Sequence, residues 1–168
     1  GAFAVTYGSG DSTLGLHISA AVTAGTTATL TASGSGTADT LTITNMLSTG
    51  NSGSATSNYT TSGSETVTYN TGAYSTASTQ DVQTINVGTN TLKILGSNEF
   101  NNAGSITAAT IDGSGATGAI TMDTAATTVT TITGGSAGDT LLGDAASTID
   151  GGAGNDVITG GTGNDTLT

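Results

Sequence analysis

The sequence has no cysteine, proline or tryptophan, and a single lysine is its only Lys or Arg residue among 168. Without cysteine the chain cannot be held by disulfide bonds, so a secreted form would need another clamp, for which a metal ion is the obvious candidate. Aromatic residues make up only 4% of the chain, which is too few to fill a thick two-layer core. The composition therefore favours a thin architecture.

Positive charge is equally scarce, since twelve carboxylates face Lys93 alone and the formal net charge is −11. Nucleic-acid binding needs Lys and Arg to replace phosphate counterions, so we expect no nucleic-acid partner. The same repulsion disfavours an anionic membrane surface. No apolar run is long enough to span a bilayer, so we expect no membrane insertion. Cations are the expected partners.

Threonine accounts for roughly a quarter of the residues and often alternates with aliphatic residues, the pattern of a pleated, half-buried strand. Together with abundant Ala, Ser and Gly, this alternation predicts an all-β solenoid with a narrow interior. Two stretches lack the pattern. Residues 48–64 have Tyr59 as their only large side chain and are expected to form a surface loop, and residues 98–105 are expected to interrupt the strands.

The last 35 residues contain a nine-residue repeat. Residues 151–159 read GGAGNDVIT and residues 160–168 read GGTGNDTLT, while residues 134–142 read GGSAGDTLL. Between them, residues 143–150 form a unit shorter by one residue. The aliphatic residues at the same place in the four units are therefore eight, nine and nine positions apart: Leu141, Ile149, Ile158 and Leu167.

Fainter copies of the repeat occur earlier in the chain. Residues 34–42 read GSGTADTLT and retain Asp39. Residues 110–120 align without gaps on residues 148–158, but Gly118 stands where the later segment has Asp156. We therefore expect one solenoid along the whole chain, of which only a part has metal sites.

The residue types of the repeat suit calcium. Glycines accept positive φ angles, so the backbone can curl and direct carbonyl oxygens at one point, and an aspartate adds anionic oxygens. If each unit is half a coil, turns at the same edge are stacked about 4.8 Å apart. Asp139 and Asp156 would then share one calcium ion. On the opposite edge Asp165 would face the short unit, where Asp144 is the only nearby carboxylate, so that site is expected to be either imperfect or completed by repeats beyond Thr168. Asp150 either supports a site or is solvated.

At these residues the chain resembles the RTX family of secreted bacterial proteins. Residues 65–168, with ETVTYN, DVQTINV and TLKIL before the repeats, are similar to the carboxy-terminal region of RTX-type bacterial surface-layer proteins. The resemblance implies a right-handed parallel β-solenoid, or β-roll, and type I secretion. It also implies calcium-dependent assembly of identical subunits into a lattice on the cell surface, with cell-surface polysaccharide as a further candidate partner.

The resemblance also implies which residues form the calcium turns. Two positions depart from the family pattern, Ala137 in place of a turn glycine and Ser147 in place of an aspartate. The expected metal-binding and turn residues are Asp39, Gly134, Gly135, Asp139, Asp144, Asp150, Gly151, Gly152, Gly154, Asn155, Asp156, Gly160, Gly161, Gly163, Asn164 and Asp165.

We accordingly divide the chain into a β-rich solenoid segment, a Ser/Thr/Gly-rich loop or insertion, a degenerate β-solenoid and an RTX calcium-binding β-roll, at residues 1–47, 48–64, 65–133 and 134–168. Because Gly1 is not methionine and Thr168 lies inside a repeat, we expect this to be a piece of a longer protein.

Four other functions compete with that of a surface-layer protein. An enzyme is not expected, because the one Gly-x-Ser-x-Gly match, at residues 134–138, lies within the repeat, and His17, the only histidine, is expected on the solvent side of a strand. A stalk segment of an RTX adhesin and the calcium-binding module of a secreted enzyme stay open as alternatives. An ice-binding face would need regular Thr-x-Thr ranks, and such segments do not recur at constant spacing along the sequence.

Overall fold

The computed structural model describes residues 2–6, 13–18, 27–33, 39–45, 56–62, 66–71, 80–122 and 128–168. Every regular element in these ranges is a β-strand. None of the residues described forms a helix with the length and apolar character needed to cross a membrane. The predicted all-β class is therefore confirmed.

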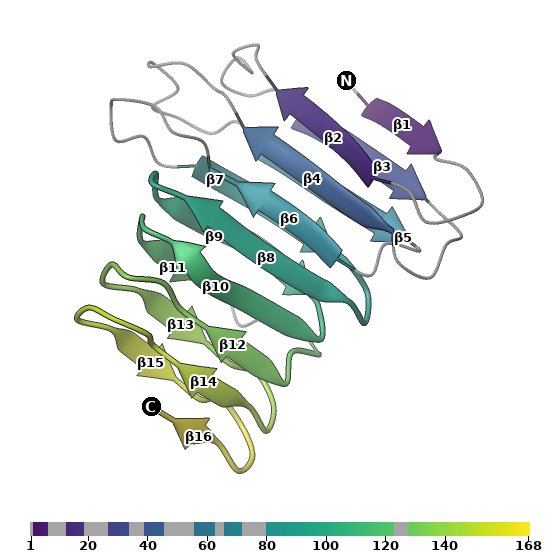
Figure 1. Ribbon diagram of the computed structural model, residues 1–168. Coiled ribbons are helices and arrows are strands. Elements are labelled where there is room, and N and C mark those ends of the chain that lie inside the picture. The colour runs from purple at the N-terminus through teal and green to yellow at the C-terminus, as the bar shows by residue number, and fades with distance from the viewer. Residues whose placement is uncertain are drawn as a thin grey trace.

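Two sheets of eight parallel strands make up the fold (Figure 1). The odd sheet contains β1 (Ala2–Thr6), β3 (Thr27–Ser33), β5 (Thr56–Ser62), β7 (Gln80–Asn86), β9 (Phe100–Thr107), β11 (Ile120–Met122), β13 (Thr140–Leu142) and β15 (Val157–Thr159). The even sheet contains β2 (Thr13–Ile18), β4 (Thr40–Asn45), β6 (Thr66–Asn70), β8 (Thr91–Gly96), β10 (Thr110–Ala116), β12 (Thr131–Thr133), β14 (Thr148–Asp150) and β16 (Thr166–Leu167).

Successive strands alternate between the two sheets, and each strand pairs in parallel with the strands two places before and after it. One strand from each sheet thus forms a coil, and the coils stack along one axis (Figure 1). This arrangement is consistent with a β-solenoid. It also confirms that a nine-residue unit is half a coil, because Leu141 pairs with Ile158 and Ile149 pairs with Leu167.

Two strands occupy segments that were expected to lack them. Strand β5 lies within the predicted loop at 48–64, and β9 covers most of the predicted interruption at 98–105. The prediction was wrong because it counted large apolar side chains. A strand inside a parallel sheet is also held by main-chain hydrogen bonds on both edges, and β-branched threonine suits that position. Strand β5 pairs with both β3 and β7. The rest of 48–64 lies outside the described residues.

The core consists of inward-facing side chains from both sheets, and the even sheet contributes two columns of them. Buried and part-exposed residues alternate along β6, as the period of a strand requires. The rings of Tyr69 and Phe100, from opposite sheets, meet edge to face with centroids 5.4 Å apart. In the even sheet the main column consists of residues with 0% exposure: Leu41, Val67, Leu92, Ile111, Ile132 and Ile149.

The coils shorten toward the carboxy-terminus, from the purple to the yellow end in Figure 1. Paired residues are 27 positions apart between Thr13 and Thr40, but 17 apart between Thr131 and Thr148. The strands shorten as well, from six residues in β2 to three in β14 and two in β16. The interior therefore becomes narrower along the stack.

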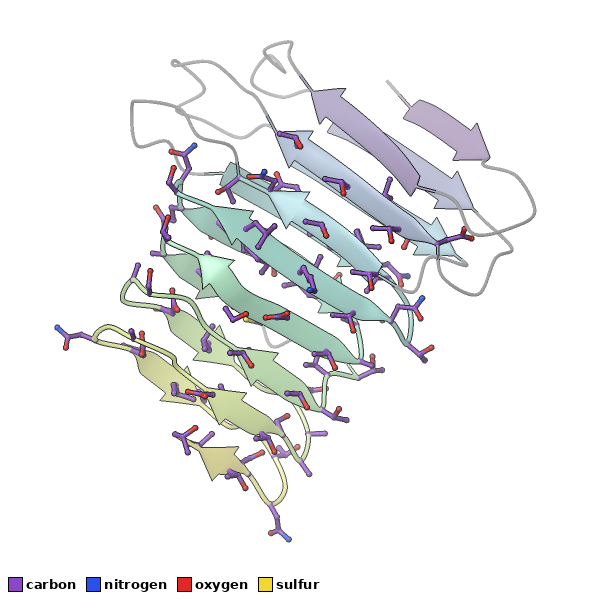
Figure 2. All side chains as sticks on the ribbon, in the orientation of Figure 1. Atoms are coloured by element: carbon purple, nitrogen blue, oxygen red, sulfur yellow. The ribbon has the colours of Figure 1, made fainter. Side chains whose placement is uncertain are left out.

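An unbroken column of threonines runs along the even sheet, next to the core column and on the other side of the strands. Each member pairs with its equivalent in the next coil: Thr13, Thr40, Thr66, Thr91, Thr110, Thr131, Thr148 and Thr166. The neighbouring column contains Lys93, Asp112 and Asp150, so the Thr-x-Thr pattern is not continuous. Figure 2 shows short side chains, many ending in oxygen, over this face.

Candidate metal centre

Two of the predicted metal-binding aspartates lie in a column that is apolar in the two preceding coils. Phe100 pairs with Ile120, and both side chains are fully buried. In the next coil Asp139 takes the place stacked on Ile120, and Asp156 follows one coil later, because Thr121 pairs with Thr140 and Thr140 with Val157. The structure thus brings Asp139 and Asp156 together on one edge, as predicted.

The residues that face the two aspartates across the coil are glycines. In the even sheet the second inward column begins with Ile43, Tyr69 and Ile94, all fully buried. It continues with buried glycines, and a side chain on Gly134 or Gly151 would collide with the carboxylate of the same repeat unit. Glycine is therefore required because the aspartate carboxylate occupies the space of the missing side chain.

Asp139 is almost completely buried, with 1% of its surface exposed. Its Oδ1 accepts a hydrogen bond from the N–H of Ile120 at 2.7 Å, and its Oδ2 accepts one from the N–H of Gly135 at 2.7 Å. Burial raises the pKa of Asp139, the two N–H groups oppose that rise, and the nearby charge of Asp156 adds to it. Asp139 therefore joins its own turn to the preceding coil.

Asp156 and Asp165 have a different set of contacts. Oδ1 of Asp156 accepts a hydrogen bond from the N–H of Asp139 at 2.9 Å, and Oδ1 of Asp165 accepts one from the N–H of Ser147 at 3.0 Å. Both residues are partly exposed. In the described part of the chain, no donor reaches the Oδ2 of either residue, so each retains a carboxylate oxygen that could bind a cation.

The turns before these two aspartates contain left-handed glycines. Gly152 and Gly154 have φ angles of 85° and 130°, and Gly161 and Gly163 have 88° and 108°. A side chain on Gly154 would collide with the carbonyl oxygen of Ala137 in the turn above. The positive φ angles and the close stacking of turns both require glycine at these positions.

The first unit forms a different turn. It has Ala137 at the fourth position, where the later units have Gly154 and Gly163, and its glycines Gly134 and Gly135 do not have positive φ. The curled turn predicted from the sequence is therefore present in the last two units.

Of the other predicted ligands, Asp144 lies in the turn that is stacked against residues 161–162. Asp144 and Asp150 are exposed; the backbone carbonyl of Asp144 accepts a hydrogen bond from Thr162, and Oδ1 of Asp150 accepts one from the N–H of Gly152 at 3.0 Å. Asn155 and Asn164 are exposed at the tips of their turns. Asp39 is buried before β4, several coils away from the repeats. No group of three or more His, Cys, Asp or Glu side chains suited to a metal occurs among the described residues.

The gap-free alignment of residues 110–120 on 148–158 is wrong beyond the strand. Ile120, rather than Gly118, lies in the column of Asp156. Eight positions separate Asp112 from Ile120, but only six separate Asp150 from Asp156, although Asp112 and Asp150 lie in the same column. Sequence reasoning consequently missed Ile120, whose backbone N–H holds the carboxylate of Asp139.

Comparison with protein-family models, with curated proteins and with solved structures finds no match to this chain. The assignment of function therefore depends on the geometry of the site. The atoms that the last two turns could offer to a cation are oxygens, namely a carboxylate oxygen of Asp156 and of Asp165 and carbonyl groups such as that of Asp144, which also accepts a main-chain hydrogen bond. This donor set fits a hard cation such as Ca²⁺, which takes six to eight oxygens in a tolerant geometry.

Proposed function

We propose that the chain is a structural component of an extracellular bacterial surface layer, which folds and self-associates in the presence of calcium. The observation that carries the proposal is the pair of turns at 151–156 and 160–165, each with two left-handed glycines and a carboxylate oxygen without a donor. The proposal includes a right-handed solenoid of the RTX type.

The calcium ligands on this proposal are Asp156 and Asp165 together with carbonyl groups of the stacked turns. Bound calcium would supply positive charge among the five aspartates between Asp139 and Asp165. Without it, their mutual repulsion opposes the closely stacked coils. At a calcium concentration 100 times the dissociation constant, one site stabilises the folded chain by about 2.7 kcal/mol.

A lattice on a cell surface is supported by the surface chemistry of the chain. In the described residues, the outer face of the even sheet has mainly short side chains, many of them ending in oxygen (Figure 2), and Lys93 is the only Lys or Arg in the sequence. Such a surface offers few sites to proteases that cleave after basic residues. It also allows calcium to bridge acidic subunits that would otherwise repel each other.

The first test is a calcium titration followed by circular dichroism. We expect calcium to order the wild-type chain, and Asp156→Ala to raise the calcium concentration at the midpoint more than Asp150→Ala does. Asp150 is the matched control, because it is an exposed aspartate of the same segment that caps its own turn. Equal effects of the two substitutions would contradict the assignment of the site.

The second test is electron microscopy of the chain with calcium and with a chelator. Sheets that form only with calcium would support the surface layer. Isolated rods would instead favour an adhesin stalk, the second candidate. That candidate is favoured by the single stacking axis, along which each coil extends the molecule by about 4.8 Å.

A further inference from the structure

The three repeat aspartates are not equivalent, and Asp139 differs from the other two. Both of its carboxylate oxygens accept backbone N–H groups, whereas Asp156 and Asp165 each use one oxygen in this way. Its 1% exposure also leaves no open side from which a hydrated cation could approach. Asp139 has the contacts of a buried structural carboxylate, satisfied by hydrogen bonds from the protein itself.

The coil around Asp139 also has an apolar interior of its own. Ile132, Leu141 and Ile149 are fully buried, and Val129 is 2% exposed. Burial of such side chains stabilises a fold without any metal. The coil around Asp139 is therefore stabilised by apolar burial as well as by the hydrogen bonds of Asp139.

The hydrogen bonds between the two coils have a direction. The N–H of Asp139 is donated to Oδ1 of Asp156, and the N–H of Ser147 is donated to Oδ1 of Asp165. The coil that contains Asp139 and Ser147 thus presents two donors that fix one oxygen of each later carboxylate. Once this coil is formed, Asp156 and Asp165 are oriented before a cation arrives.

We infer that Asp139 closes its coil without metal, so that the stack is ordered through Ile149 in the absence of calcium and calcium orders only residues 151–168. The inference rests on the proposed calcium binding and assigns its ordering effect to the second of two adjacent coils. The metal-free coil is the template on which the calcium-dependent coil forms.

Hydrogen–deuterium exchange of the full 168-residue chain, read on peptic peptides, tests the inference. With a chelator, we expect slow exchange in residues 131–149 and fast exchange in residues 157–167. With calcium, residues 157–167 should become protected while residues 131–149 change little. Fast exchange in both segments without calcium, followed by joint protection with it, would overturn the inference and leave the proposed calcium binding intact. No effect of calcium on either segment would overturn both.

Two substitutions separate the roles of the carboxylates. Asp139→Asn should speed exchange in residues 131–149 by about tenfold or more, with and without calcium, because its amide nitrogen cannot accept a backbone N–H. Asp156→Asn should leave that segment protected in chelator and raise the calcium midpoint for residues 157–167. If Asp139→Asn raised the calcium midpoint as much as Asp156→Asn and left exchange in chelator unchanged, Asp139 would be a calcium ligand and the inference would fail.

Discussion

In the coils between residues 39 and 122, the interior is filled by large apolar side chains such as Tyr69 and Phe100, whereas between residues 134 and 165 the equivalent positions have glycine and aspartate. We call these two parts the apolar region and the glycine region. The parallel pairing is continuous across both, so main-chain hydrogen bonding does not distinguish them. The same coil architecture can therefore have an apolar interior, whose stability depends little on pH or calcium, or an interior that contains carboxylates, whose stability depends on both.

The largest expected effect is in the apolar region. Phe100→Ala removes a fully buried ring that contacts Tyr69 across the two sheets, and should lower the free energy of unfolding by about 3–5 kcal/mol. The loss should be the same with calcium and with chelator. Urea unfolding followed by circular dichroism measures it, with the 47% exposed Leu167 changed to Ala as the matched control. A loss that appeared only in chelator would show that the two regions are not independent.

The next effect concerns the turns of the glycine region. Gly154→Ala combines a φ of 130° with a collision against the carbonyl oxygen of Ala137, and should cost about 2–4 kcal/mol. Gly88→Ala is the control, because Gly88 has a φ of 65° and open space where the methyl group would lie. It should cost only the backbone strain of about 1–2 kcal/mol. Thermal unfolding in calcium compares the two variants, and equal losses would mean that stacking of the turns contributes nothing.

The stability that Asp139 contributes and the stability that calcium contributes should change with pH in opposite directions. Because burial raises the folded-state pKa of Asp139 above 3.8, its contribution to stability is fully present below pH 3.8 and is lost as the pH rises through the raised pKa. In chelator, the stability of the wild type relative to Asp139→Asn should therefore fall as the pH increases. With calcium, total stability should rise with pH, because protons compete with the cation for carboxylates. Chemical unfolding at a series of pH values measures both quantities, and a stability of the wild type relative to Asp139→Asn that rose with pH in chelator would contradict this assignment.

The smallest effect is expected at the ion pair on the outer face. Lys93 and Asp112 are 3.8 Å apart and both partly exposed, so Lys93→Met should change stability by about 0–1 kcal/mol. The pKa of Asp112 is lowered mainly by the hydroxyl of Ser114, partly opposed by desolvation, with a smaller contribution from Lys93. An NMR titration should therefore show a larger rise of this pKa in Ser114→Ala than in Lys93→Met. The reverse order would make the ion pair the main determinant.

The sequence was sufficient to predict the all-β class, the half-coil unit and the meeting of Asp139 with Asp156. These features depend on local alternation and on a tandem repeat of nearly constant length. The sequence was insufficient to predict β5, because the composition of residues 56–62 does not reveal their main-chain pairing with β3 and β7. It also could not distinguish Asp139 from Asp156, since the N–H of Ile120 comes from a coil that is two residues longer between Asp112 and Ile120 than the repeat is between Asp150 and Asp156.

The threonine column of the even sheet was missed for a related reason. A regular row of threonines is expected to show constant spacing along the sequence. Thr40 and Thr66, however, are 26 positions apart, while Thr91 and Thr110 are 19 apart. The segments between strands differ in length, and strand pairing removes that difference in space.

This column has a consequence for any molecule that meets the even sheet. The interval between neighbouring hydroxyl-bearing residues is set by the distance between paired strands, about 4.8 Å, whatever the length of the connecting chain. Residues could therefore be inserted between strands, for example to carry a tag or an epitope, without altering the period of the row. The number of coils alone determines how far that row extends.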